Sequence, residues 1–132
     1  MTSASRAYVH SQLKTVAGIS GRVFQQGSII TSQMVKPYLV HHFGNNTAEG
    51  LYDYASGGFR PNRQFLSIYV HVDQGDYGPI DELMPLIKDA LINGPKPADL
   101  IEVVYLETSQ DLQDELLQTY FRYMRFQLIQ AR

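Results

Sequence analysis

The histidines have the greatest potential for chemistry, because imidazole binds metal ions and exchanges protons near neutral pH. His41 and His42 are neighbours in a segment that reads as a strand, so their side chains point to opposite faces and cannot easily chelate one ion together. A pairing of His41 with His71 across a sheet is conceivable. Neither has a carboxylate at helical spacing, so the pattern favours polar residues on a wet face. We therefore expect no metal and no cofactor.

Acidic side chains gather in two places, each a conceivable catalytic or cation site. One cluster lies in a polar link without the apolar shell that would raise a carboxyl pKa, and comprises Asp111, Asp114 and Glu115. The other departs from the calcium-loop spacing and lacks the final Glu, and comprises Asp73, Asp76 and Asp81. Solvated turns and helix capping account for both clusters.

Signatures of other enzyme classes are missing. The sequence contains no cysteine, which excludes thiol nucleophiles, thiolate metal sites and disulfides. Gly57-Gly58 is not followed by Lys-Ser or Lys-Thr, no Gly-x-Gly-x-x-Gly opens a helix, and no serine lies in a Gly-x-Ser-x-Gly elbow. We therefore expect a protein that is not an enzyme.

Composition indicates one domain over residues 1–132, since a chain of this length buries enough surface for a single core. The formal net charge of -2 lacks the basic excess of a protein that holds duplex nucleic acid tightly. Apolar runs are only a few residues long, and the first residues have no apolar stretch of signal-peptide length. We expect neither export by that route nor a membrane span.

Hydrophobic periodicity predicts an α+β domain with a mostly antiparallel or mixed sheet of four to five strands and two helices on one face. The second helix either is capped by Asp81, with Pro85 in its first turn, or begins at Pro79 and kinks. The last two strands are expected to be antiparallel neighbours. The predicted order is helix 3–16, a short extended piece 22–24, strand 37–43, a long loop or hairpin arm at about 44–63, strand 64–73, helix 80–91, and strands 101–107 and 117–130.

The two faces of the predicted sheet differ in composition. The aliphatic face would pack under the helices and comprises Leu66, Ile68, Val70, Val72, Val104, Leu106, Met124, Phe126 and Leu128. The amphipathic face comprises Phe65, Tyr69, His71, Val103, Tyr105, Phe121, Tyr123, Arg125 and Ile129. Tyr and Arg are enriched where protein surfaces meet. This second face is therefore half covered by the long loop, forms a subunit interface, or does both.

The predicted arm contains more aromatic and apolar side chains than a solvated loop needs, namely Leu51, Tyr52, Tyr54 and Phe59, followed by Arg60. Long loops in compact domains are usually functional or disordered, and this content favours function.

Several segments together resemble the tail terminator, or tail-completion, proteins of bacteriophages with long non-contractile tails, above all those that infect actinobacteria. The similarity covers most of the chain and rests on layout, without a catalytic signature. The segments are Gly21-Arg22-Val23-Phe24 after the first helix, Lys36-Pro37-Tyr38-Leu39-Val40, the strand Phe65–Val72 leading through Gly75-Asp76-Tyr77 into the Ile80-Asp81 helix, Val104–Ser109, and Tyr120–Phe126.

The resemblance implies a non-enzymatic virion protein, assembled in the host cytoplasm. It would form a ring, typically a hexamer, that caps the head-proximal end of the tail tube. Its partners would be the major tail tube protein and the head connector or head-completion protein, with DNA passing through the lumen without specific binding. A head-completion or connector-stopper protein is a first alternative. A small cytoplasmic enzyme or ligand-binding domain that uses His71 and the 73–76 turn is an alternative of another class.

A closed ring needs two different matching patches on each subunit. The amphipathic face, represented by Phe65, Tyr69, His71, Tyr105, Phe121, Tyr123 and Arg125, is expected to contact a neighbouring subunit. The arm is expected to contact the tube or a neighbour, and the two assignments are interchangeable. Asp111, Asp114 and Glu115 are also expected to pair across subunits with Arg122 or Arg125.

Overall fold

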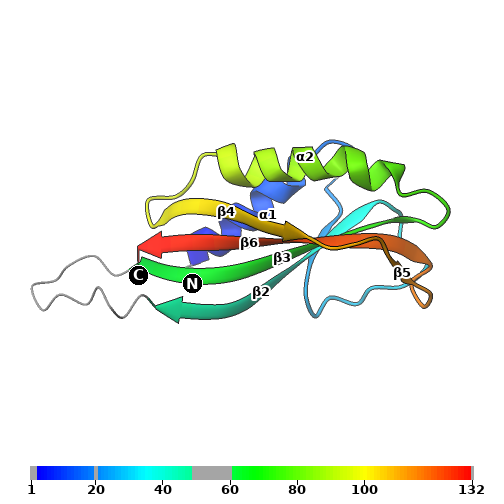
Figure 1. The fold of residues 1–132 in the computed structure, drawn as a ribbon, viewed down its shortest axis with the longest axis horizontal. Coiled ribbons are helices and arrows are strands. Elements are labelled where there is room, and N and C mark those ends of the chain that lie inside the picture. Colours follow the sequence, from blue (N-terminus) through cyan, green and yellow to red (C-terminus); the bar gives the residue numbers. More distant parts are fainter. Residues whose placement is uncertain (1–2, 20, 49–60, 132) are drawn as a thin grey trace, which may run out of the picture.

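A computed structural model describes residues 3–19, 21–48 and 61–131 and consists of two helices and a single six-stranded sheet (Figure 1). The helices are α1, Ser3–Lys14, and α2, Gly78–Asn93. The strands are β1 Val23–Gln25, β2 Tyr38–Ala48, β3 Pro61–Asp73, β4 Leu100–Thr108, β5 Leu112–Asp114 and β6 Thr119–Ala131. Among the described residues, no helix is long and apolar enough to cross a membrane.

The sheet has the strand order β1-β2-β3-β6-β4, and the short β5 pairs with β6 beyond the end of β4. Among the strand pairs of the described residues, only that of β1 with β2 is parallel. The predicted α+β class is confirmed, as is the antiparallel pairing of the last two long strands. The sheet gains a strand over the predicted number because the polar link after β4 contains β5.

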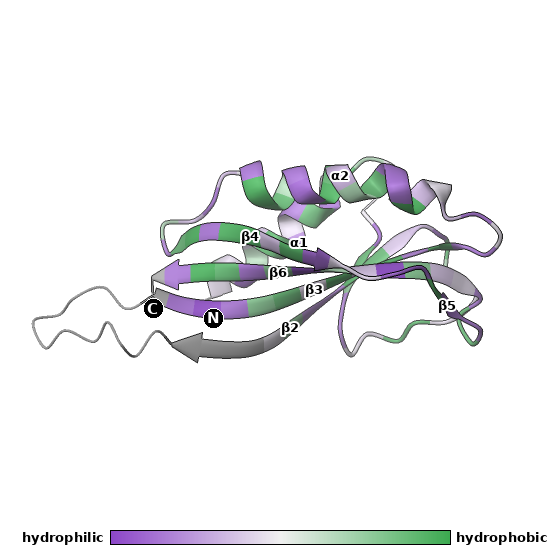
Figure 2. Ribbon diagram, in the orientation of Figure 1, coloured by the Kyte–Doolittle hydropathy of each residue, from purple (hydrophilic) through white to green (hydrophobic). Residues whose placement is uncertain are grey.

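The core lies between the helices and one face of the sheet. Buried side chains of α1 and α2 recur every three to four residues, as Tyr8, Val9, Leu13 and Ile80, Leu83, Met84, Ile87, Leu91 do. Figure 2 shows the corresponding alternation of hydrophobic and hydrophilic residues along α2. Beneath them, β3 and β6 contribute alternate residues that are at most 2% exposed, namely Leu66, Ile68, Val70, Val72, Met124, Phe126 and Leu128. These strands were predicted in the correct phase.

Strand β4 has the opposite phase to the prediction. Val103 is 2% exposed and lies opposite Leu128, on the helix-covered face, whereas Leu106 is 41% exposed. Val104 pairs with Gln127 and is half-buried. Two register irregularities, between Leu100 and Glu102 and between Tyr105 and Glu107, interrupt the alternation. With apolar residues in both phases of the strand, alternation alone could not select the buried one.

The two ends of the predicted arm belong to strands β2 and β3. Strand β2 continues to Ala48 and β3 begins at Pro61, and the two pair antiparallel with a register shift between Phe43 and Asn46. The long loop expected at 44–63 is therefore partly strand. The predicted contact residues Leu51, Tyr52, Tyr54, Phe59 and Arg60 lie outside the described residues.

Helix α2 follows the second predicted alternative, since it begins at Gly78, next to Pro79, and contains Pro85 in its interior. The Asp76 carboxylate accepts a hydrogen bond from the Gly78 N–H at 2.8 Å, which satisfies a donor of the first turn. Its other end is held by α1. There the Tyr8 hydroxyl donates to the Leu91 carbonyl at 2.7 Å.

Candidate protein-interaction site

The face of the sheet opposite the helices presents a row of aromatic rings. Tyr69 of β3 lies opposite Tyr123 of β6, with ring centroids 5.6 Å apart, and its ring is 6.3 Å from that of Phe121. At the end of the row nearer the hairpin arm, the Arg125 guanidinium lies 5.4 Å from the centre of the Phe65 ring. All five side chains are half-buried. Such rings bury large area yet keep a polar tip or a cation in water, which suits a surface that another protein covers.

His71 lies on this face but is buried at 6% exposure. Its ring is stacked between those of Tyr38 and Phe121, with centroids 4.9 Å and 5.0 Å away, and its Nδ1 lies 2.9 Å from the Thr119 hydroxyl. Burial lowers the pKa of His71 to about 4, although nearby Asp114 acts in the opposite direction. A neutral, buried and stacked imidazole of this kind is poorly placed for acid–base chemistry at neutral pH.

Tyr105 does not lie on this face, contrary to the prediction. It pairs with Phe126 on the helix-covered side, where the two rings meet edge to face at 5.8 Å. The Lys88 ammonium of α2 lies 3.9 Å from the centre of its ring. Val103 was predicted on the same face as Tyr105, and it lies instead in the core. The predicted interaction face therefore loses Tyr105 and Val103, and it gains Tyr38, Val40 and His42 of β2, whose partners are His71, Tyr69 and Ser67.

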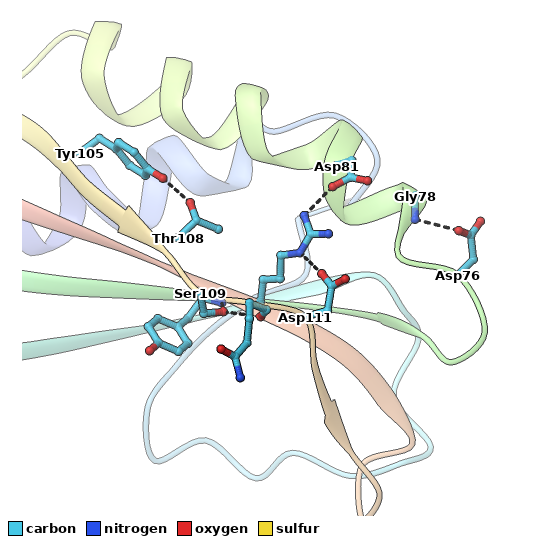
Figure 3. Close-up of polar contacts among 10 residues, drawn as sticks. Asp76, Gly78, Asp81, Tyr105, Thr108, Ser109 and Asp111 are labelled. Atoms are coloured by element: carbon cyan, nitrogen blue, oxygen red, sulfur yellow. Dashed lines mark hydrogen bonds and ion pairs between the residues drawn. The ribbon is translucent and has the colours of Figure 1, made fainter.

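Arg122 forms its ion pairs within one chain. Its guanidinium contacts the carboxylates of Asp111, just before β5, and of Asp81, in the first turn of α2 (Figure 3). Hydrogen bonds to these carboxylates raise the pKa of Arg122 further, with that of Asp111 the larger influence. The structure thus pairs Asp111 and Arg122 internally, where pairing between subunits was expected. The other predicted partners lie at the end of β5 and in the turn after it: Asp114 accepts a hydrogen bond from the Leu117 N–H at 2.9 Å, and Glu115 is exposed.

We expect Arg122→Met to lower the free energy of unfolding by about 1–2 kcal/mol, because it leaves two carboxylates without their shared cation. Urea denaturation followed by circular dichroism measures this change. Arg125→Met is the matched control, since Arg125 pairs with the single carboxylate of Glu107 at 3.1 Å and its side chain is 40% exposed, against 17% for Arg122. If both variants lose the same free energy of unfolding, the stabilising role assigned to the Arg122 ion pairs is wrong.

A histidine pair that sequence reasoning did not anticipate lies on the helix side. His10 Nδ1 of α1 is 3.1 Å from His41 Nε2 of β2, beside a pocket of about 440 Å³ that Arg6 and Gln25 also line. Burial, followed by the charges of His10 and Arg6, lowers the pKa of His41 to about 4. The helical spacing of α1 placed His10 next to the buried stripe, but its partner on β2 depends on tertiary packing.

The conceivable pairing of His41 with His71 is wrong, because the two lie on opposite faces of the sheet. His41 and His42 also diverge, as predicted. Within residues 3–19, 21–48 and 61–131, no group of three or more His, Asp or Glu side chains is arranged to hold a metal ion. His41 Nδ1 is buried and has no hydrogen-bond partner in the described part of the chain, whereas a metal-bound histidine normally donates its other ring N–H to an acceptor. The geometry of the pair therefore does not fit metal ligation.

The fold is similar to that of a chain described as "Virion of native gene transfer agent (GTA) particle", with a TM-score of 0.70 and 15% sequence identity. The similarity covers 98% of this chain and 96% of that chain. At this identity it shows a shared α+β fold extending over the whole length. No protein-family model matches the chain, and no curated protein matches it.

Proposed function

We propose that this chain is a structural protein of a phage-like virion, and specifically the tail terminator of a long non-contractile tail. In this role it forms a ring, with six subunits as the expected number, on the head-proximal end of the tail tube. The ring ends polymerisation of the tube and offers a docking surface to the head connector. DNA passes through the ring without specific binding.

The observation that carries the proposal is the half-buried aromatic face around Tyr69 and Tyr123, which neither helix covers. A ring subunit must present surface to its neighbours, and Tyr and Arg residues suit that surface. Two further observations support the role. The fold is shared over the whole length with a chain from a virion particle, and the segments quoted above resemble those of tail terminators.

Deleting the coding sequence from the virion genome tests the role directly. A tail terminator mutant is expected to produce overlong tails without heads, seen by negative-stain electron microscopy of lysates. DNA-filled heads without tails, together with tails of normal length, would instead indicate a connector-stopper protein. Normal infectious particles would contradict both virion roles.

The same face is tested with purified protein. Alone or mixed with tail tube protein, the wild-type chain is expected to form six-fold rings. Tyr69→Ser combined with Tyr123→Ser is expected to weaken ring formation at least about tenfold, because truncating central aromatic residues of an interface typically costs more than about 1 kcal/mol each. Leu86→Ser is the matched control, because Leu86 is 44% exposed and lies on α2, across the sheet from the aromatic face. If the wild type, the double tyrosine variant and Leu86→Ser form rings equally well, the aromatic face is not part of the subunit interface.

A further inference from the structure

A pocket of about 310 Å³ lies on the aromatic face, at the end of the sheet away from the hairpin arm. Its floor includes Tyr69, His71 and Phe121, and its walls are the loop after β1, through Ile30, and the turn between β5 and β6, through Leu117. The lining thus combines aromatic and aliphatic side chains with polar ones, namely Gln25, Gln26, Ser28 and Asp114. The pocket is therefore a recess between two loops at one end of this face.

The rim of this pocket exposes apolar side chains. Ile29 and Leu116 are each 89% exposed, more than any other large hydrophobic residue among those described, and each directly precedes a pocket-lining residue in the sequence. The two walls of one recess thus each present an uncovered aliphatic side chain. Exposed apolar side chains beside both walls of one pocket favour its covering by another protein.

The chain contains a segment of matching chemistry. Residues 49–60, between the ends of β2 and β3, include Leu51, Tyr52, Tyr54 and Phe59. Figure 1 shows that β2 ends and β3 begins at the opposite end of the sheet from the turn between β5 and β6. The apolar residues in the sequence of this segment therefore match the aromatic and aliphatic part of the pocket lining.

This segment cannot reach the pocket of its own chain. Strand β3 runs from Pro61 to the pocket residues Tyr69 and His71, a distance of about 26–33 Å at the strand rise per residue. A 12-residue segment held at both ends extends at most about 22 Å from its base, because the chain must run out and return. A contact between the two must therefore join different copies.

We infer that segment 49–60 of one subunit docks into the pocket between Ile29 and Leu116 of the next subunit. The contact joins two different patches, so it is heterologous and its repetition generates a ring or an open chain of subunits. The inference rests on the proposed ring and deepens it by naming the contact between neighbours.

Disulfide trapping tests the contact, since the chain has no cysteine of its own. Leu116→Cys combined with Tyr54→Cys is expected to give a ladder of disulfide-linked multimers on a non-reducing gel after mild oxidation, and a single band after reduction. Leu86→Cys with Tyr54→Cys is the matched control, because Leu86 is exposed on α2, and it is expected to remain monomeric. No ladder with the first pair, a ladder as strong in the control, or an intramolecular disulfide would overturn the inference.

Mixing two defective variants provides a second test. Ile29→Ser with Leu116→Ser removes the rim, and Tyr52→Ser with Tyr54→Ser alters the docking segment, so each variant alone is expected to be monomeric by light scattering. In an equimolar mixture, the intact segment of the rim variant can dock into the intact pocket of the segment variant. The mixture is expected to form dimers and nothing larger, because each dimer then has no intact segment or pocket left. Wild-type assembly by either variant alone, or a monomeric mixture, would overturn the inference.

The two proposals fail in distinguishable ways. Six-fold rings that persist in the rim variant, without disulfide trapping, would remove the docking contact and leave the tail terminator role intact. If the disulfide ladder forms but deletion of the protein leaves tail length unchanged, the docking contact stands and the tail terminator role fails. Loss of tail tube binding in the rim variant, with no trapping between copies, would assign the pocket to the tube protein and overturn the inference.

Discussion

Replacing Val103 by Ala is expected to lower the free energy of unfolding by about 2 kcal/mol, because it removes buried methyl groups and leaves a cavity. Val103→Asp is expected to cost more than about 4 kcal/mol, since the carboxylate would be buried without a partner. Val103 is 2% exposed under α2, opposite Leu128. Urea denaturation followed by circular dichroism measures both changes.

The neighbouring residue provides the control for this pair of substitutions. Val104 is half-buried opposite Gln127 on the other face, so Val104→Ala and Val104→Asp are each expected to cost less than the corresponding change at Val103. The prediction of the phase of β4 from alternation alone requires the reverse order. A larger loss at Val104 would therefore contradict the observed phase of β4.

Acid is expected to destabilise the protein through His71 and His41. Burial lowers the pKa of each to about 4 from an ordinary value of 6.5, so the unfolded chain binds more protons than the folded chain between these values. The stabilisation from the neutral imidazoles is complete above about pH 6.5 and is lost as the pH falls towards about 4. The melting temperature should decrease by at least about 5 °C between pH 7 and pH 4.5.

Variants separate the titration from the packing. His71→Phe keeps an aromatic ring between Tyr38 and Phe121 and removes the titrating group, so it is expected to flatten the decrease with pH. Thr119→Val removes the hydroxyl 2.9 Å from His71 Nδ1 and leaves the imidazole, so it should lower the melting temperature while preserving the pH dependence. A wild-type pH slope in His71→Phe would show that His71 does not contribute.

The parts of the fold that the sequence predicted are those with a single dominant signal. Strand β3 alternates cleanly from Leu66 to Val72, and α2 repeats at helical spacing, so both were predicted in the correct phase. Strand β4 has adjacent valines and two irregularities of register, so local alternation could not distinguish its faces. Tyr105 was assigned to the wrong face for this reason.

The candidate site was predicted in part. Phe65, Tyr69, His71, Phe121, Tyr123 and Arg125 lie on one face as expected, because β3 and β6 are regular and adjacent. Two other interactions join elements that are distant in the sequence. They are the ion pairs of Arg122 with Asp81 and Asp111 and the contact of His10 with His41. Their geometry depends on where α1 and α2 pack, which residue spacing within one segment does not specify. The pocket walls are likewise loops that meet only in the folded chain.

The central position of β6 has a kinetic consequence. This strand pairs with β3 along its whole length, and α2, β4 and β5 all intervene between the two in the sequence. Joining them requires closure of a long loop before any ladder hydrogen bond forms, which raises contact order and slows folding towards the millisecond-to-second range. Until β6 pairs with them, β3 and β4 expose unpaired backbone edges that favour aggregation. Formation of the assembly-competent subunit is therefore expected to depend on this last strand.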